Sequence, residues 1–455
     1  MTTRSILQVF DRYQKERVAF VQNIAELAIR PQNVDLLHQA HVLELLRPLL
    51  TDICIQIQQC AIIALGRLVN HDVRLAQQIL SQDFISLLIH NIDKKNKYYK
   101  KAVLFVLRSL CKHDAEMASM VISSPGTLEA LLICLEDFEP IVKENAAWAL
   151  GYIARHSSYL AQSVVDTGAL PLLVLCLQEP EIALRQIGAS ALSDIAKHSV
   201  DLAQSVVDAG AVPHLAKSLN NPDEKLKRQI LAGLSSIAKH TTELAEVVVE
   251  AEIFPGVLIH MAHACPIIRK NAAALVRDVV KHSLELTQLV VNTGGIGAII
   301  ESMAQPTEES KVPCITACGF ISGHSDLIAM SVIGCEGILQ LKHILETSKD
   351  DATLSVTAWA LGQIGKHSPE HSKAVAAAGV FPMLLRFYTS INTSEDLKYK
   401  SKVTLKQCLQ KCLLMSALEP LIHDCPKNIL KYVLGQFSKV GIYFLLHFFY
   451  RDDSF

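Results

Sequence analysis

Residues 199–240 read SVDLAQSVVDAGAVPHLAKSLNNPDEKLKRQILAGLSSIAKH, and this stretch is sufficient to predict the fold. Ser199 precedes an apolar segment that stops at Gly210, so a short first helix is expected between an N-cap and a helix-ending glycine. A second helix is expected through VPHLAKSL, because Pro213 is tolerated in an opening turn. The third and longest helix is expected over residues 224–239, where apolar residues recur at helical spacing: Leu226, Ile230, Leu234 and Ile237.

The same pattern recurs along the chain. A histidine ends each copy at intervals of 42 or 43 residues, namely His71, His113, His156, His198, His240, His282, His324 and His367. Three helices in a period of about 42 residues is the armadillo arrangement. One such copy cannot bury its own apolar face, so neighbouring copies must stack. The period therefore predicts an all-α armadillo-repeat solenoid, a right-handed superhelix without strands.

The markers also suggest a division of the chain. Residues 1–40 are expected to form a degenerate N-terminal repeat, residues 41–380 eight repeats, and residues 381–440 degenerate C-terminal repeats. Residues 441–455, GIYFLLHFFYRDDSF, form a divergent apolar tail. The run from Ile442 to Tyr450 is too short to span a membrane, so we expect it to dock onto the last helices or to promote aggregation.

Composition argues against several classes of partner. Half of the residues are hydrophobic and only 6% are aromatic, which suits closely packed helices. A formal net charge of -2 gives no reason to expect a nucleic acid or a membrane surface as partner. The 12 cysteines include no CxxC pair, so reduced thiols in the cytoplasm are expected. The helical pairs Cys314/Cys318 and Cys408/Cys412 could bind a metal but are expected to be buried hydrophobic residues.

Catalytic signatures are missing from the sequence. It contains no GxSxG, P-loop or HExxH motif, so we expect no enzyme activity, no cofactor, no metal and no small-molecule substrate. The recurring histidines lie near the ends of third helices, where a ring can bond the last carbonyls and complement the helix dipole. They occupy equivalent positions of a stack, so they cannot converge on one site.

The third helices are expected to line the binding face of the solenoid. Positions eight, four and one residues before each histidine share a helix face, because seven residues make about two turns. Two such rows carry aromatic residues: Trp148, Tyr152 and Arg155 form one, and Trp359, Gln363 and Lys366 form the other.

Two series of cations follow the same period. The first lies near the start of each third helix and comprises Lys101, Lys143, Arg185, Lys227, Arg269 and Lys311. The second lies one residue before the histidines and comprises Lys112, Arg155, Lys197, Lys239, Lys281 and Lys366. Helix dipoles explain the second series, which we call the helix-end row. The first series, the basic row, is interpreted either as solvated or paired charge or as an exposed strip for an acidic partner.

Two stretches carry a family resemblance. NAAWALGYIA (residues 145–154) and TAWALGQIG (residues 357–365) resemble the third helix of armadillo repeats, a class that includes importin alpha and beta-catenin. Longer stretches, among them residues 6–33, 172–199, 248–255 and 417–440, resemble the sperm-associated antigen six family. The tail departs from that family, whose members continue with a polar segment.

The resemblance implies a structural component of the central apparatus in motile cilia and sperm flagella, located in the cytoplasm and cytoskeleton at the axoneme. Other axonemal central-apparatus proteins and the microtubule (tubulin) are the implied partners, and acidic tubulin surfaces would suit the basic row. A peptide-binding adaptor of the beta-catenin or importin alpha type is the alternative. The series of Asn residues by which importin alpha grips a peptide is missing here. The positions four residues before the histidines hold no Asn: Arg67, Ser109, Tyr152, Asp194, Ser236, Asp278, Phe320 and Gln363.

Overall fold

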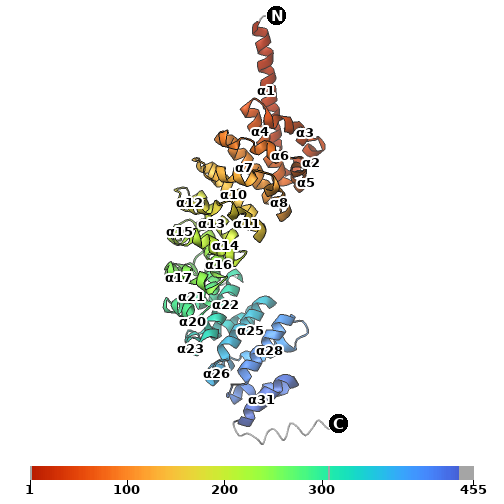
Figure 1. Ribbon diagram of the computed structural model, residues 1–455. Coiled ribbons are helices and arrows are strands. Elements are labelled where there is room, and N and C mark those ends of the chain that lie inside the picture. Colours follow the sequence, from red (N-terminus) through yellow and green to blue (C-terminus); the bar gives the residue numbers. More distant parts are fainter. Residues whose placement is uncertain (1–2, 306–307, 440–455) are drawn as a thin grey trace. The chain divides into compact units, whose positions relative to one another are not determined.

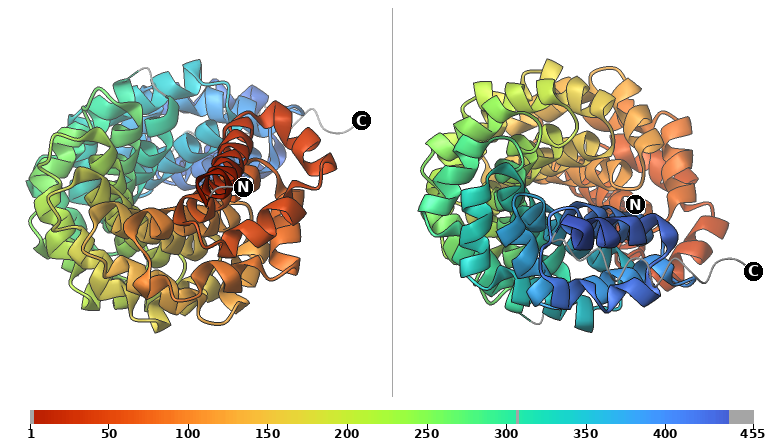
Figure 2. Two further views of the ribbon diagram at one scale, coloured as in Figure 1. Left: turned by 90° about the horizontal axis from the view of Figure 1, so that it is seen from above. Right: turned by 90° about the horizontal axis from the view of Figure 1, so that it is seen from below.

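The computed structural model describes residues 3–305 and 308–439, and its regular elements there are helices without any strand (Figure 1). The two views of Figure 2 show the same all-helical construction. The predicted all-α fold is therefore confirmed. The predictions for the tail, residues 441–455, lie outside the described residues.

The chain divides into two compact halves after Ile237. The N-terminal half begins with the long helix α1 (Thr3–Leu27) and continues with triples of helices. The first helices of these triples are α2 (Pro31–Gln39), α5 (Val73–Ser81), α8 (Ala115–Ser123), α11 (Ser158–Asp166) and α14 (Val200–Asp208). The second are α3 (Val42–Leu46) with the 3-10 turn η1 (Arg47–Thr51), α6 (Phe84–Ile89) with η2 (Ile92–Lys94), α9 (Thr127–Leu135), α12 (Ala169–Cys176) and α15 (Ala211–Ser218). The third are α4 (Ile55–His71), α7 (Lys97–Cys111), α10 (Pro140–His156), α13 (Ile182–Ala196) and α16 (Glu224–Ala238).

The C-terminal half, from Ala238, repeats the scheme. Its first helices are α17 (Thr242–Glu250), α20 (Leu284–Asn292), α23 (Asp326–Gly334) and α26 (Pro369–Ala377). Its second helices are α18 (Phe254–His260), α21 (Gly295–Ala304), α24 (Gly337–Thr347) and α27 (Val380–Thr389). Its third helices are α19 (Pro266–Val280), α22 (Glu308–His324), α25 (Asp351–Gly365) and α28 (Glu395–Leu409), followed by α29 (Met415–Leu418), α30 (Leu421–Asp424) and α31 (Lys427–Lys439).

Each triple turns a sharp corner between its first and second helices. In the triple used for the prediction, the Ser199 hydroxyl accepts a hydrogen bond from the Leu202 backbone N–H, which caps α14. Gly210 then takes φ of 80°, the left-handed conformation that glycine adopts without steric cost. The predicted helices of residues 199–240 are thus confirmed. The same left-handed corner recurs in the described residues at His41, Asp83, Gly126, Gly168, Gly210, Glu252, Gly294, Glu336 and Gly379.

The core lies mainly between third helices. In the N-terminal half α4 packs against α7, α7 against α10, and α10 against α13, whereas in the C-terminal half α19, α22, α25 and α28 pack in sequence. Small side chains permit this close approach, as at Ala146, Ala149 and Ala191, which are all fully buried. The third helices that these contacts join therefore form one row in each half.

The boundaries of the predicted division do not coincide with the ends of whole triples of helices. Helix α1 is one 25-residue helix that packs against α4, and Arg67 of α4 donates to the Ala25 carbonyl at 2.5 Å. At the other end α26, α27 and α28 form a full triple, although residues 381–440 were expected to be degenerate. We therefore propose a division that follows the helices, with a cap at residues 3–27, triples over residues 31–409 and short closing helices over residues 415–439.

Candidate partner-binding surface

An aromatic and cationic cluster lies on third helices of the N-terminal half. On α10 the rings of Trp148 and Tyr152 lie 5.4 Å apart between centroids. The Arg108 guanidinium of α7 lies 5.9 Å from the Trp148 ring and 5.4 Å from the Phe105 ring. All four side chains are half-buried, so they present apolar area and a cation at the surface. We call these four residues the tryptophan cluster.

The C-terminal half carries a counterpart on α22 and α25. The rings of Phe320 and Trp359 meet edge to face with centroids 5.2 Å apart. Trp359 lies over Gly319, where an added Cβ would come within 2.2 Å of the indole, so glycine makes room for the ring. Lys366 donates to the Gln363 side-chain oxygen at 2.6 Å. The predicted row Trp359, Gln363 and Lys366 therefore shares one face.

The sequence prediction of the first aromatic row was incomplete. Trp148 and Tyr152 are in contact, but Arg155 is exposed at the end of α10, and the cation that stacks on Trp148 is Arg108. Arg108 lies outside the three counted positions, yet it follows Phe105 by one helical turn. That spacing is the signal that could have identified it.

The basic row does not form an exposed strip throughout. Lys101 is exposed on α7, as the functional interpretation requires. Lys143, on α10, instead donates to Glu179 Oε1 at 2.5 Å, so it is paired with the next repeat. Lys227 and Lys311 are half-buried on α16 and α22.

The two arginines of the basic row have a structural role. Arg185 Nε donates to the Glu179 carbonyl at 2.6 Å, and Arg269 Nη1 donates to the His263 carbonyl at 2.6 Å. Both therefore tie the loop that precedes their own helix. Only 7% of Arg269 is exposed, so the expectation of a surface cation is wrong at this position.

Two lysines of the helix-end row bond the preceding repeat. Lys112 Nζ donates to the Asn70 carbonyl at 2.8 Å, near the end of α4, and Lys281 Nζ donates to the Lys239 carbonyl at 2.6 Å, just after α16. These lysines therefore bond backbone carbonyls at the end of the preceding repeat's third helix, a contact that the dipole of their own helix does not describe. Partial burial lowers the pKa of both amines. Lys197 donates to Asp194 at 2.7 Å.

The histidines connect repeats. His198 Nε2 donates to the Ala154 carbonyl at 2.8 Å, and the carbonyl belongs to the third helix of the preceding repeat. The prediction that each ring bonds the carbonyls of its own helix end is therefore corrected, because the ring reaches across the junction. The same contact, at 2.6 to 2.8 Å, is made by His113, His156, His282, His324 and His367.

Replacing His198 with alanine is expected to lower the free energy of unfolding by about 1–2 kcal/mol, because it removes a half-buried bond and leaves a carbonyl without this donor. Urea denaturation followed by circular dichroism measures the change. His71→Ala is the matched control, since His71 is exposed at the same repeat position. Equal effects of the two substitutions would refute the junction role.

The paired cysteines are buried in the helix packing. Burial raises the pKa of Cys314 and of Cys318 to about 12, and it likewise raises the pKa of Cys408 to about 12. These thiols are therefore protonated at neutral pH and are poor metal ligands. Among the residues that the structure describes, no group of three or more His, Cys, Asp or Glu side chains is placed to hold a metal ion.

Within the described ranges, no single helix has the length and apolar character needed to cross a bilayer. Three helix pairs, each bent at a corner, meet the measure of length and composition together: α8 with α9, α11 with α12, and α23 with α24.

Comparison with known proteins identifies the repeat. The model of the Armadillo/beta-catenin-like repeat matches residues 114–155 and 199–239. An engineered protein of known structure superposes with a TM-score of 0.80 at 21% identity, over 86% of this chain and 94% of that chain. A designed armadillo repeat protein in complex with the peptide (KR)4 gives a TM-score of 0.50 at 20% identity, over 52% of this chain and 98% of that chain. These likenesses establish the fold as an armadillo solenoid.

Similarity to one protein extends over nearly the whole sequence. Sperm-associated antigen 6 of Mus musculus is 52% identical over 440 residues, which are 97% of this chain and 87% of that protein. Sperm-associated antigen 6 of Homo sapiens is 52% identical over 101 residues, which are 22% of this chain and 20% of that protein. The chain therefore belongs to the sperm-associated antigen 6 family of armadillo-repeat proteins.

Proposed function

We propose that the chain is a non-catalytic protein-binding scaffold in the central apparatus of motile cilia and sperm flagella, where it supports axoneme integrity and motility. The observation that carries this proposal is the 52% identity to mouse sperm-associated antigen 6 over 97% of the chain. The name of that relative associates it with sperm, and the family resemblance implies an axonemal, cytoskeletal location. Partners are other proteins of the central apparatus.

The tryptophan cluster is the surface we propose for partner binding. Half-buried aromatic rings with an adjacent arginine are the residue types that dominate protein interfaces. The designed armadillo protein in complex with the peptide (KR)4 supports the use of this fold for peptide binding. Here Arg108 already stacks on Trp148 and Phe105. A cation in that place disfavours a basic peptide and favours a neutral or acidic one.

Microtubules are a further proposed partner, through the exposed part of the basic row. Lys101 is exposed on α7, and Lys94 is exposed at the end of η2. Two lysines that lie between these in sequence are paired. Lys97 binds Glu139 at 3.0 Å, and Lys100 binds Asp137 at 2.7 Å. Lys94 and Lys101 are therefore the exposed lysines of this segment outside these ion pairs, and an acidic tubulin surface would complement them.

Replacing Trp148 and Tyr152 together with alanine is expected to reduce the recovery of axonemal partners about tenfold or more, because such anchors contribute most of an interface's binding energy. Tagged protein is purified from ciliated or germ cells, and the co-purified proteins are quantified by mass spectrometry. Tyr159→Ala is the matched control, since Tyr159 is 71% exposed on the first helix α11.

Circular dichroism checks that both variants stay folded. Unchanged recovery by the folded double variant would contradict the role of the tryptophan cluster. Recovery of junctional or nuclear proteins by the wild type, in place of axonemal proteins, would contradict the proposed function itself.

A further inference from the structure

A cavity of about 430 Å³ lies between two adjacent repeats of the N-terminal half, and no residue of the tryptophan cluster lines it. Its lining comes from the end of α12, the first turn of α13, helix α15 and the turn that follows α15. Leu177 is buried and supplies the apolar part of the wall. The polar lining consists of Gln178, Arg185, His214, Lys217, Ser218 and Asn221.

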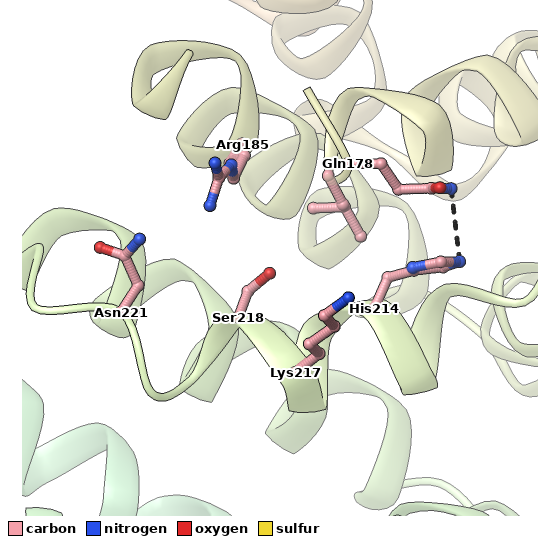
Figure 3. Close-up of a pocket in the computed structure, with 7 residues that line it drawn as sticks. Gln178, Arg185, His214, Lys217, Ser218 and Asn221 are labelled. Carbon is pink, nitrogen blue, oxygen red and sulfur yellow. Dashed lines mark hydrogen bonds between the residues drawn. The ribbon is translucent and has the colours of Figure 1, made fainter. Parts of the chain in front are cut away.

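Cationic groups approach the cavity from both sides. Figure 3 shows Arg185 on one side, with His214, Lys217 and Ser218 of α15 across from it. His214 is held by Gln178 at 3.3 Å between the side-chain nitrogens. The described lining contains two permanent cations and no carboxylate. The cavity is therefore positively charged.

Two acids close to the lining in sequence are engaged elsewhere. Glu179, next to the lining residue Gln178, accepts from Lys143, so its carboxylate is paired with a lysine that does not line the cavity. Asp223 accepts from the Gln186 side chain and from the Leu226 backbone N–H, and it caps α16. Neither carboxylate lines the cavity, so the charge of Arg185 and Lys217 faces it without an acidic partner in the wall.

Arg185 is held in place before any ligand arrives. Its Nε donates to the Glu179 carbonyl at 2.6 Å, and its Nη2 donates to the Pro180 carbonyl at 3.2 Å. The remaining N–H groups of the guanidinium can donate to an anion, and little side-chain entropy is lost on binding. Lys217, in contrast, is exposed in the last turn of α15 and can adjust to the ligand.

The repeat itself does not require a polar residue at the positions of Lys217 and His214. One period of 42 residues earlier, Leu175 stands at the place of Lys217, and one period later Ile259 does. Both apolar side chains are more than half exposed, at 53% and 71%. At the place of His214 the neighbouring copies have Leu172 and Gly256. Arg185 belongs to the recurring basic row, whereas the two neighbouring copies have no counterpart of Lys217 and His214.

We propose that this cavity binds an acidic peptide segment of a partner, with a carboxylate placed between Arg185 and Lys217. Charge-assisted hydrogen bonds from an arginine and a lysine are the usual protein recognition of a carboxylate. The cavity volume lies within the usual range of ligand pockets, about 300–1,000 Å³, and has room for several atoms beyond the anionic group. A peptide side chain with its backbone therefore fits better than an isolated anion.

Fluorescence anisotropy with the purified full chain tests this site independently of any axonemal role. Fluorescein-labelled octaglutamate is expected to bind, with an affinity that falls as salt is added, whereas octaglutamine is expected not to bind. Lys217→Ala should weaken octaglutamate binding about tenfold, since it removes one charge-assisted contact. Lys217→Arg should retain binding.

Lys225→Ala is the matched control, because Lys225 is an exposed lysine of the same repeat outside the cavity. Its binding should equal that of the wild type. The proposal is overturned if Lys217→Ala binds octaglutamate as the wild type does, or if Lys225→Ala loses as much affinity, which would indicate non-specific charge attraction. Complete displacement by inorganic phosphate at the peptide's own concentration would show a simple anion site instead.

Discussion

Reversal of Arg269 to glutamate is expected to destabilise the C-terminal half by about 3–5 kcal/mol, because it removes two hydrogen bonds from a charged donor and buries an uncompensated carboxylate. Arg269 is only 7% exposed, and its guanidinium donates to the His263 carbonyl at 2.6 Å and to the Ala264 carbonyl at 3.0 Å. Glutamate offers no donor and would bring a carboxylate against two carbonyl oxygens. The loop before α19 would then lose its tether.

Lys101→Glu is the control for this prediction, because Lys101 occupies the same repeat position on α7 and is exposed. Its effect should stay within about 0.5 kcal/mol, as is usual for surface substitutions. Urea denaturation of the full chain measures the stability of both variants. In a repeat protein the two halves need not unfold together. Similar stability of the two variants would show that Arg269 does not hold the loop.

Because Arg269 is buried and Lys101 is exposed, members of the basic row differ in what their reversal would test. Simultaneous reversal of Lys143, Arg185, Lys227 and Arg269 would combine surface charge with loop tethers. Loss of partner binding by that variant would therefore report unfolding as readily as a lost docking surface. Lys94 and Lys101 are the better pair to reverse, since both are exposed and neither tethers a loop.

Much of the fold could be predicted because each signal in the repeat is local. N-cap serines, the Gly210 stop and the apolar spacing of residues 224–239 each act within one helix or turn, and the structure places the helices accordingly. The left-handed corners between first and second helices could be predicted from the sequence only in part. Glu252 and Glu336 adopt φ of 55° and 63°, which the neighbouring helices impose although glutamate does not favour this conformation.

The contacts of the candidate site were less predictable because they cross between repeats. The period identifies His198 and Lys281, but only the packing shows that each bonds a carbonyl of the repeat before it. Arg269 and Lys101 are equivalent in sequence, yet the first is buried and the second exposed. Burial at one repeat position depends on the particular loop beside it, which the period does not encode.

The axonemal location is the central claim, and it predicts firm retention on the microtubule framework. A tagged full chain expressed in multiciliated cells should remain in the axonemal pellet after detergent removes membranes and soluble proteins. Contacts made through exposed lysines such as Lys94 and Lys101 are screened by salt. Raised salt should therefore release a part of the chain, and reversal of both lysines to glutamate should lower retention at moderate salt.

Quantitative detection of the tagged chain in detergent-extracted axonemes is the most direct measurement of this claim, with imaging of the same cells to locate it. The account predicts that most of the chain stays with the pellet and lies along the central pair of microtubules. Recovery of the chain in the soluble fraction, or its concentration at cell junctions or in the nucleus, would contradict an axonemal scaffold and favour an adaptor of another kind.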